Sequence, residues 1–229
     1  MIKDAQECHP PRARKFSLDQ RLIQGVLVTL CRLLTGIRSF WHSLPDTGQA
    51  TIYYANHSSH LDGLVIWASL PRALRNRVHP VAAADYWNKT ALRRYLATRI
   101  FNAVLVERRS APAEASTDVS SRDPLLPLVE KLSAGHSLIF FPEGTRGTGD
   151  EVAAFKSGLF HLIQRVPQVR LVPVWLENMN RVLPKGSRLV VPIICTATFG
   201  TALEKSAEDE GKREFLARAK QALEALTHD

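Results

Sequence analysis

The residues with the clearest chemical potential lie in the segment 56–62, which reads Asn-His-Ser-Ser-His-Leu-Asp. It follows an apolar, β-rich run at 51–55 and leads into a helical pattern at 60–70, so we expect it at the carboxyl end of a strand. Open α/β sheets place their ligands at that end. His57 and Asp62 can then meet, with the carboxylate on one imidazole nitrogen and the other nitrogen left to accept a proton. This pattern predicts a general base with an orienting acid.

Two other interpretations of this segment stay open from the residues alone. Asp62 can be an acid stabilised by the free N–H groups of a first helical turn, with Ser59 as N-cap and His60 on the surface. His57, His60 and Asp62 can also bind zinc, although no further ligand cluster of recognisable spacing accompanies them. The local pattern is therefore compatible with catalysis, with helix capping and with metal binding.

A second segment, 141–147, reads Phe-Pro-Glu-Gly-Thr-Arg-Gly and follows the most apolar strand pattern of the chain. Its glycines and threonine allow the backbone to turn N–H donors towards an anion. Arg146 adds a planar guanidinium that suits phosphate. A plain turn is the simpler interpretation, because Pro-Glu-Gly is favourable turn chemistry, and the segment lacks the Gly-Lys-Ser/Thr ending of a Walker loop.

Together the two segments are more specific than either alone. Asn-His-x-x-x-x-Asp, followed about eighty residues later by Phe-Pro-Glu-Gly-Thr-Arg, resembles the glycerophospholipid acyltransferase family, typified by 1-acylglycerol-3-phosphate acyltransferases. Weaker family blocks occur in the same order: an apolar run ending in arginine at 104–108, Val-Pro-Val at 172–174, and Lys156 with Gly158 after the second segment. The similarity covers roughly residues 50–200, and Glu107 departs from it where the family often has Asp.

The resemblance implies transfer of a fatty-acyl group from an acyl thioester to a hydroxyl of a glycerophosphate lipid, with 1-acylglycerol-3-phosphate as the leading acceptor and phosphatidate as product. It makes His57 the general base and Asp62 its support. It implies no metal or cofactor, only a donor substrate, acyl-CoA or acyl carrier protein thioester. Glycerol 3-phosphate or another lysophospholipid stays open as acceptor, and a metal-dependent hydrolase is the alternative. Acceptor binding is assigned to Arg108, Glu143, Gly144, Thr145 and Arg146.

The chain lacks the usual signals of an acyl-enzyme route. It has no Gly-x-Ser-x-Gly segment, and none of its three cysteines lies in the sequence beside one of the two reactive segments. Direct transfer to the acceptor hydroxyl is therefore expected. The three cysteines are far apart and odd in number, which is typical of a reducing compartment and argues against a disulfide framework.

Charge points to an anionic partner. The formal net charge is +8, and the excess is concentrated between residues 72 and 109, where nine basic residues face only two acids. A membrane surface and a phosphorylated lysophospholipid acceptor both fit this excess. Nucleic acid is not expected, because aromatic residues are only 7% of the chain and no recognition motif occurs. The basic residues are Arg72, Arg75, Arg77, Lys89, Arg93, Arg94, Arg99, Arg108 and Arg109.

Short apolar runs alternate with helical patterns after residue 45, which predicts an α/β fold with a largely parallel central sheet flanked by helices. Several runs lack two-fold alternation, as expected of strands buried on both faces. Expected strands are 51–55, 78–84, 103–106, 137–141, 170–176 and 189–198. Expected helices are 60–70, 88–99, 123–134, 155–166 and 207–226.

The amino-terminal region divides into a polar tail at 1–17 and an amphipathic segment at 18–44. In the second, apolar residues recur at helical spacing, which predicts a helix, or a helix pair broken near Gly36. Its apolar face can lie in a membrane interface or pack on the domain, and the two are compatible. Residues 45–229 form the expected acyltransferase domain, with a mobile loop at about 110–123.

Localisation follows from the same region. Residues 1–17 do not resemble a signal peptide, and the apolar stretch 22–31 falls short of the ~20 residues that a spanning helix needs. We therefore expect peripheral, monotopic association with the cytoplasmic face of a membrane, without a spanning helix.

Overall fold

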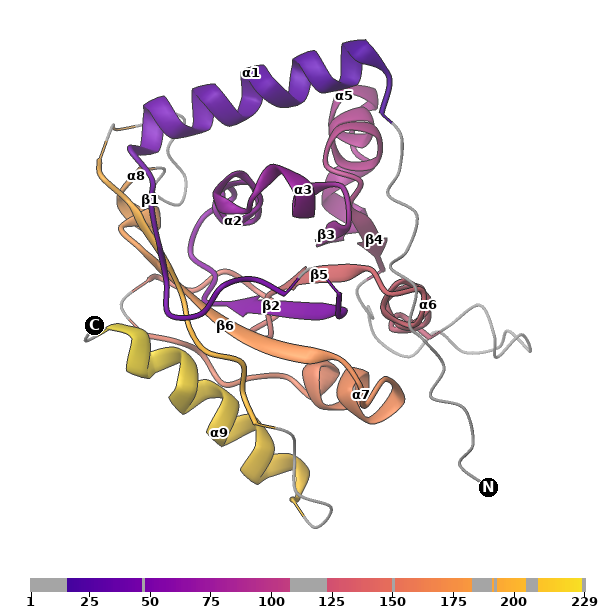
Figure 1. Ribbon diagram of the computed structural model, residues 1–229, viewed down its shortest axis with the longest axis vertical. Coiled ribbons are helices and arrows are strands. Elements are labelled where there is room, and N and C mark those ends of the chain that lie inside the picture. Colours follow the sequence, from indigo (N-terminus) through magenta and orange to yellow (C-terminus); the bar gives the residue numbers. More distant parts are fainter. Residues whose placement is uncertain are drawn as a thin grey trace.

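The computed structural model describes residues 16–46, 48–107, 123–149, 151–182, 191, 193–204 and 210–227. Within them, seven strands form one sheet in the order β1-β7-β6-β2-β5-β3-β4 (Figure 1). Neighbouring strands are parallel except β6 and β7, which are antiparallel. The predicted α/β class with a largely parallel sheet is confirmed. The strands are β1 (Arg38–Trp41), β2 (Thr51–Ala55), β3 (Val78–Ala83), β4 (Val104–Val106), β5 (Ser137–Phe140), β6 (Arg170–Glu177) and β7 (Thr196–Phe199).

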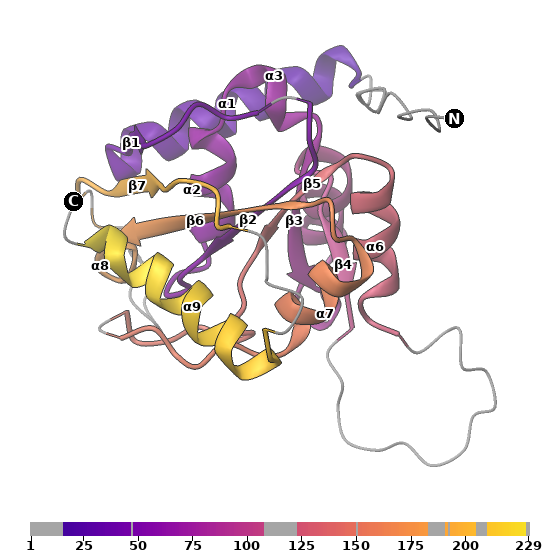
Figure 2. The same cartoon turned by 60° about the horizontal axis from the view of Figure 1, so that its bottom comes forward.

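Helices cover both faces of the sheet (Figures 1 and 2). On one face lie α2 (Asp62–Ser69) and α3 (Arg72–Arg75), and α1 (Leu18–Thr35) packs on α2 as an outer layer. The other face carries α6 (Leu126–Ser133), α7 (Gly158–Arg165) and α9 (Lys212–Glu224). Short elements complete the described chain: α4 (Ala84–Trp87), α5 (Ala91–Tyr95), the π-helix η1 (Leu96–Ile100), α8 (Met179–Val182) and the 3₁₀ turn η3 (Ala225–Thr227).

Strand β2 explains how the sheet divides the core. All five of its residues are buried. Tyr53 and Ala55 belong to the apolar cluster under α1 and α2, whereas Ile52 and Tyr54 belong to the cluster under α6, α7 and α9. Successive side chains of a strand point to opposite faces, so a run buried on both faces is apolar at nearly every position. A rigid, doubly covered β2 therefore leads directly into the segment 56–62.

The amphipathic segment 18–44 is helical only in its first part. Helix α1 ends at Thr35, and Gly36 adopts the left-handed conformation (φ 51°) that commonly ends a helix. The chain then forms β1 beside β7, with the N–H of Arg38 donating to the carbonyl of Cys195 at 3.0 Å. The predicted continuation of the helix, or a second helix, as far as Leu44 is therefore wrong, because main-chain pairing with a distant strand takes those residues.

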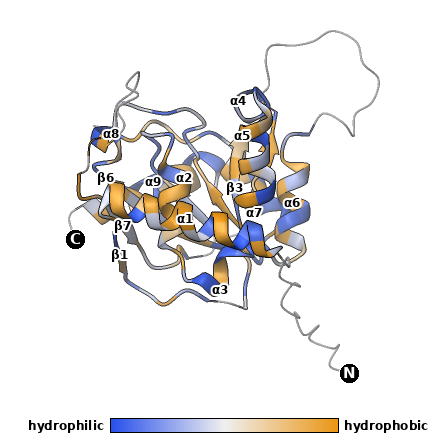
Figure 3. Ribbon diagram, turned by 90° about the horizontal axis from the view of Figure 1, so that it is seen from above, coloured by the Kyte–Doolittle hydropathy of each residue, from blue (hydrophilic) through white to orange (hydrophobic). Residues whose placement is uncertain are grey.

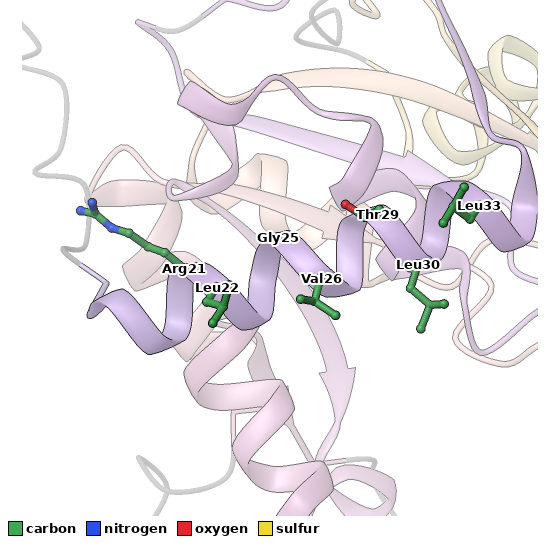
Figure 4. A pocket seen from close by; sticks show the side chains of 7 residues that line it. All are labelled: Arg21, Leu22, Gly25, Val26, Thr29, Leu30 and Leu33. Carbon is green, nitrogen blue, oxygen red and sulfur yellow. The ribbon is translucent and has the colours of Figure 1, made fainter.

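The apolar face of α1 points outward. Exposed fractions are 70% for Leu22, 57% for Val26, 47% for Leu30 and 74% for Leu33. Figure 4 shows Leu22, Val26 and Leu30 projecting from the same side of the helix, along an open groove formed by α1 residues. Figure 3, which looks onto α1, shows hydrophobic residues recurring along it. The core-packing interpretation of this face is wrong.

The inner face of α1 is instead mixed in character. Val28, Cys31 and Thr35 are buried against the domain. The Thr35 hydroxyl donates to the carbonyl of Cys31 at 2.7 Å, and Gln24 Nε2 donates to the carbonyl of Ile100 at 2.7 Å. Because main-chain carbonyls satisfy these polar groups, the helix can turn them towards the domain and leave Leu22, Leu30 and Leu33 exposed.

Other expected elements differ mainly in their ends. The pattern at 88–99 forms α5 continued by the π-helix η1, and the last helix is shorter than 207–226. Of the strand expected at 189–198, the structure describes β7 (Thr196–Phe199). The expected loop at 110–123 lies outside the described residues except for Asp123. Among the helices that the structure describes, none combines the length and the hydropathy needed to cross a bilayer.

Candidate active site

The two reactive segments meet because β2 and β5 are parallel neighbours. Their carboxyl ends lie at the same edge of the sheet, and the segments 56–62 and 141–147 leave from these ends. The N–H of Gly147 donates to the carbonyl of His57 at 2.8 Å, which joins the two turns directly. Asn56 joins the first turn to β6, since its side chain both donates to and accepts from the main chain of Leu176 at 2.8 Å.

His57 and Asp62 form a hydrogen-bonded pair. His57 Nδ1 lies 2.9 Å from Asp62 Oδ2, and the Asp62 side chain is fully buried whereas that of His57 is 21% exposed. An ionised carboxylate only accepts hydrogen bonds, so the pairing places the imidazole proton on Nδ1 and the free lone pair on Nε2. No described residue hydrogen-bonds to Nε2. This is the geometry of a base and its orienting acid.

Asp62 also organises the turn that carries the histidine. Its Oδ2 atom accepts the main-chain N–H groups of Ser58 at 2.7 Å and Ser59 at 2.8 Å. Helix α2 starts at Asp62 itself, so Ser59 is not its N-cap, contrary to the capping interpretation. The same carboxylate oxygen therefore holds the main chain of the turn and orients the imidazole.

Phe141 gives the imidazole a second constraint. Its ring stacks on that of His57 with centroids 4.2 Å apart and planes inclined by 21°. The side chain comes from the residue after β5, so the second segment contacts the first through a ring as well as through Gly147. The sequence motif assigns no role to Phe141, and its position directly before Pro-Glu-Gly is the signal that could have suggested one.

Glu143 lies inside the site. It is only 3% exposed. Its Oε1 accepts the main-chain N–H of His57 at 2.7 Å, and its Oε2 accepts that of Ala153 at 3.0 Å. Both carboxylate oxygens are thus engaged by main-chain donors. Its predicted contact with the acceptor stays a prediction, while the structure gives its carboxylate a place in holding the histidine turn.

The remaining predicted acceptor residues lie around the next turn. Gly144 has φ 71°, and a Cβ there would lie 2.8 Å from Nζ of Lys156, so both backbone and neighbour favour glycine. Gly144 and Thr145 are exposed, and Arg146 is half-buried. Arg146 makes no ion pair with any described residue. Arg108, also assigned to the acceptor, lies outside the described residues.

His60 faces a cationic surrounding. Burial lowers its pKa, and electrostatic interactions with Arg146, His57 and Arg93 lower it further, while Asp62 acts in the opposite direction. No group of three or more His, Cys, Asp or Glu side chains arranged for a metal ion occurs in the described part of the chain.

The fold and the two joined motifs define a family. Residues 39–177 match the family described as Acyltransferase, which is more than half of the chain, so this protein belongs to that family. The crystal structure of 1-acyl-sn-glycerophosphate acyltransferase PlsC from Thermotoga maritima has the same fold: the TM-score is 0.64 over 92% of this chain and 82% of that one, at 18% identity. The resemblance drawn from the motifs is confirmed.

Several curated relatives are similar in sequence. A chloroplastic 1-acyl-sn-glycerol-3-phosphate acyltransferase of Arabidopsis thaliana is 27% identical over 63% of this chain and 36% of its own. One from Limnanthes alba is 27% identical over 82% of this chain and 61% of its own. The protein named Taffazin of Dictyostelium discoideum is 29% identical over 82% of this chain and 68% of its own. The chain thus spans between 36% and 61% of the length of these two plant relatives.

Proposed function

We propose that this protein transfers a fatty-acyl group from an acyl thioester to a hydroxyl of a phosphate-bearing lysophospholipid, with 1-acylglycerol-3-phosphate as the leading acceptor. The observation that carries the proposal is the 2.9 Å contact between His57 Nδ1 and a buried Asp62, which leaves Nε2 available as a base. The names of the plant relatives support this acceptor.

The reaction follows from the free Nε2 atom. His57 takes the proton of the acceptor hydroxyl, whose oxygen attacks the thioester carbonyl carbon. Asp62 stabilises the imidazolium that forms. Collapse of the tetrahedral intermediate breaks the carbon–sulfur bond, and the imidazolium returns its proton to the departing thiolate. The ester bond replaces the thioester bond, and the histidine ends neutral.

Arg146 is the described cation best suited to the acceptor phosphate. It is half-buried, it follows the glycine turn of the second segment, and no described carboxylate neutralises it. A guanidinium binds phosphate oxygens through two parallel N–H donors. We assign Gly144 and Thr145 to the same site from the family resemblance, and Arg108 on that ground alone.

Glu143 has a different part in this scheme. Its buried carboxylate holds the N–H of His57, while the N–H of Gly147 holds the carbonyl of the same residue. The base is therefore fixed through its main chain from both sides. We assign Glu143 to positioning His57, because both of its oxygens already bind main-chain donors.

The outward face of α1 suits the surface of a membrane. Leucines and a valine occupy it, and the exposed Arg21 lies on the same helix, where it can reach lipid head groups. Arg32 instead donates to the carbonyl of Ala68 at 3.0 Å. Such a helix lies in the interface plane without crossing it. Peripheral attachment would bring the site to its lipid substrates.

Acyl transfer with purified protein tests the proposal. The acceptors are 1-acylglycerol-3-phosphate, glycerol 3-phosphate and a zwitterionic lysophospholipid, each with acyl-CoA and with acyl carrier protein thioester. We expect ester product from at least the first acceptor, with activity unchanged by a metal chelator. Absence of ester product from every pair would refute the proposed function, and hydrolysis of the thioester alone would favour a hydrolase.

A further inference from the structure

Three side chains from separate elements stack beside the reactive segments. The ring of His60 lies on that of Tyr86 in α4, with centroids 4.8 Å apart and planes inclined by 20°. On the Tyr86 ring lies the guanidinium of Arg93 in α5, with Cζ 4.5 Å from the centroid. Trp87 meets Tyr86 edge to face at 5.6 Å, which limits the movement of the central ring. The stack links α5 to the turn that carries His57.

The stack lies in a region where positive charge is not balanced by nearby carboxylates of the described residues. Arg93 and Arg146 both act on the protonation of His60, so both guanidiniums lie within electrostatic reach of that ring. Neither forms an ion pair with a residue in the described ranges. Both guanidiniums are half-buried and act on the same imidazole, and a pair of cations without a carboxylate partner favours binding of an anion beside them.

We propose that Arg93, held on Tyr86, joins Arg146 in binding the head group of the acceptor, and that this second guanidinium selects a phosphomonoester over a zwitterionic phosphodiester. The inference rests on the proposed function and narrows its acceptor class. Tyr86 and His60 position the guanidinium, since a flexible arginine side chain gains a fixed direction from an aromatic platform.

Charge explains the selection. A phosphomonoester carries a charge of about −1.5 to −2 at pH 7 and offers three acceptor oxygens. A phosphodiester carries one negative charge, which a choline or ethanolamine group offsets. One guanidinium is enough to bind the phosphodiester, whereas a second guanidinium strengthens binding of the phosphomonoester. The neighbouring imidazole stays mainly neutral at pH 7, because its pKa is lowered, and so supplies a platform without competing for the anion.

Binding of soluble head groups tests this inference independently of acyl transfer. Glycerol 3-phosphate and glycerophosphocholine are titrated into the full chain and followed by NMR or calorimetry. We expect wild type to prefer glycerol 3-phosphate. Arg93→Ala should lower the affinity for glycerol 3-phosphate by roughly ten- to hundred-fold, the range for loss of one charge-assisted hydrogen-bond partner. Its affinity for glycerophosphocholine should stay within about three-fold of wild type.

Arg94 offers a matched control. It is the next residue of α5, it is exposed, and Arg94→Ala removes the same charge. This variant should bind both probes as wild type does. Tyr86→Phe should also preserve binding, whereas Tyr86→Leu should approach Arg93→Ala because it removes the platform.

Three outcomes would overturn the inference: equal wild-type affinity for the two probes, no binding of glycerol 3-phosphate, or equal losses in Arg93→Ala and Arg94→Ala. None of these depends on turnover. If wild type transfers no acyl group yet shows the expected binding pattern, the proposed function fails while the phosphomonoester site stands.

Discussion

The carboxylate of Glu143 accepts the main-chain N–H of His57 at 2.7 Å, across 86 residues of sequence. Because the other oxygen of the same carboxylate holds Ala153, Glu143 ties the histidine turn to the loop that follows the second motif. The two family motifs are therefore one structural unit around a single imidazole.

Glu143→Gln should lower kcat without raising the KM for the acceptor. The amide presents an NH₂ group to one of the two main-chain N–H groups, so one charge-assisted hydrogen bond is lost and His57 loses its fixed direction. We expect kcat to fall by about ten- to hundred-fold.

Arg146→Ala is the comparison for Glu143, since it should chiefly raise the acceptor KM. Steady-state kinetics with varied acceptor separates the two effects, and thermal unfolding shows whether each variant is folded. A folded Glu143→Gln enzyme with wild-type kcat and a raised acceptor KM would contradict the positioning role and indicate that Glu143 contacts the acceptor directly.

Asp62→Asn should impair turnover through the imidazole tautomer. An amide NH₂ group facing Nδ1 favours the proton on Nε2, which then has no lone pair for the acceptor hydroxyl. We expect kcat to fall by roughly 10²–10⁴-fold, the range of general-base catalysis. NMR of the histidine ring nitrogens reports the tautomer directly. A wild-type kcat together with an altered His57 tautomer would show that Asp62 is not needed for catalysis.

The outward face of α1 should bind anionic vesicles. Leu30→Glu with Leu33→Glu places two charges on this face, where the side chains are 47% and 74% exposed, so folding should be little affected. We expect affinity for phosphatidylglycerol vesicles to fall at least about ten-fold, since burial of one leucine is worth about 1.5–3 kcal/mol. Leu126→Glu, at a 41% exposed leucine of α6, is the control. Equal vesicle binding by the double variant and wild type in a flotation assay would contradict this assignment.

His136 should make stability depend on pH. Burial lowers its pKa, and the charges of Lys131 in α6 and Arg77 beside β3 lower it further, while a main-chain contact to Arg77 opposes them; the ring of His79 packs edge to face on it. The unfolded chain therefore takes up the proton more readily. Its stabilising contribution is present above the ordinary histidine pKa of about 6.5 and is lost as pH falls through the lowered value.

His136→Phe should reduce this dependence. Between pH 7.5 and 5.5, the urea midpoint of wild type should fall further than that of the variant, which lacks the titrating ring. Carboxylates contribute equally to both proteins, so the difference between the two slopes isolates the histidine. Parallel slopes would show that His136 titrates alike in the folded and unfolded chains.

The sequence predicted the part of the fold that local pattern determines. The run at 51–55 is largely apolar, and β2 occupies those residues. The helical period of 18–44 continued past Gly36 because Phe40 and Leu44 happen to fit it, whereas β1 forms through pairing with β7 far along the chain. Hydropathy also did not decide which face of α1 points inward. The main-chain carbonyl of Ile100 accepts a hydrogen bond from the Gln24 side chain, so the polar face of the helix can pack on the domain.

The candidate site divides in the same way. Spacing predicted that His57 and Asp62 could meet, and they do. It did not indicate that Glu143 faces the main chain of His57, or that Arg93 rests on Tyr86, because both contacts depend on how separate elements pack. The residue types were visible in the sequence; their partners were set by tertiary structure.

The most direct test of the account is the acyl-transfer kcat of His57→Ala beside that of Ser58→Ala. Ser58 is the adjacent residue, and its N–H bond to Asp62 does not involve its side chain, so that variant controls for disturbance of the turn. We predict a loss of at least about 10²–10⁴-fold for His57→Ala in a folded protein and near wild-type turnover for Ser58→Ala. Full activity of His57→Ala, or complete loss in a folded Ser58→Ala, would contradict direct general-base transfer.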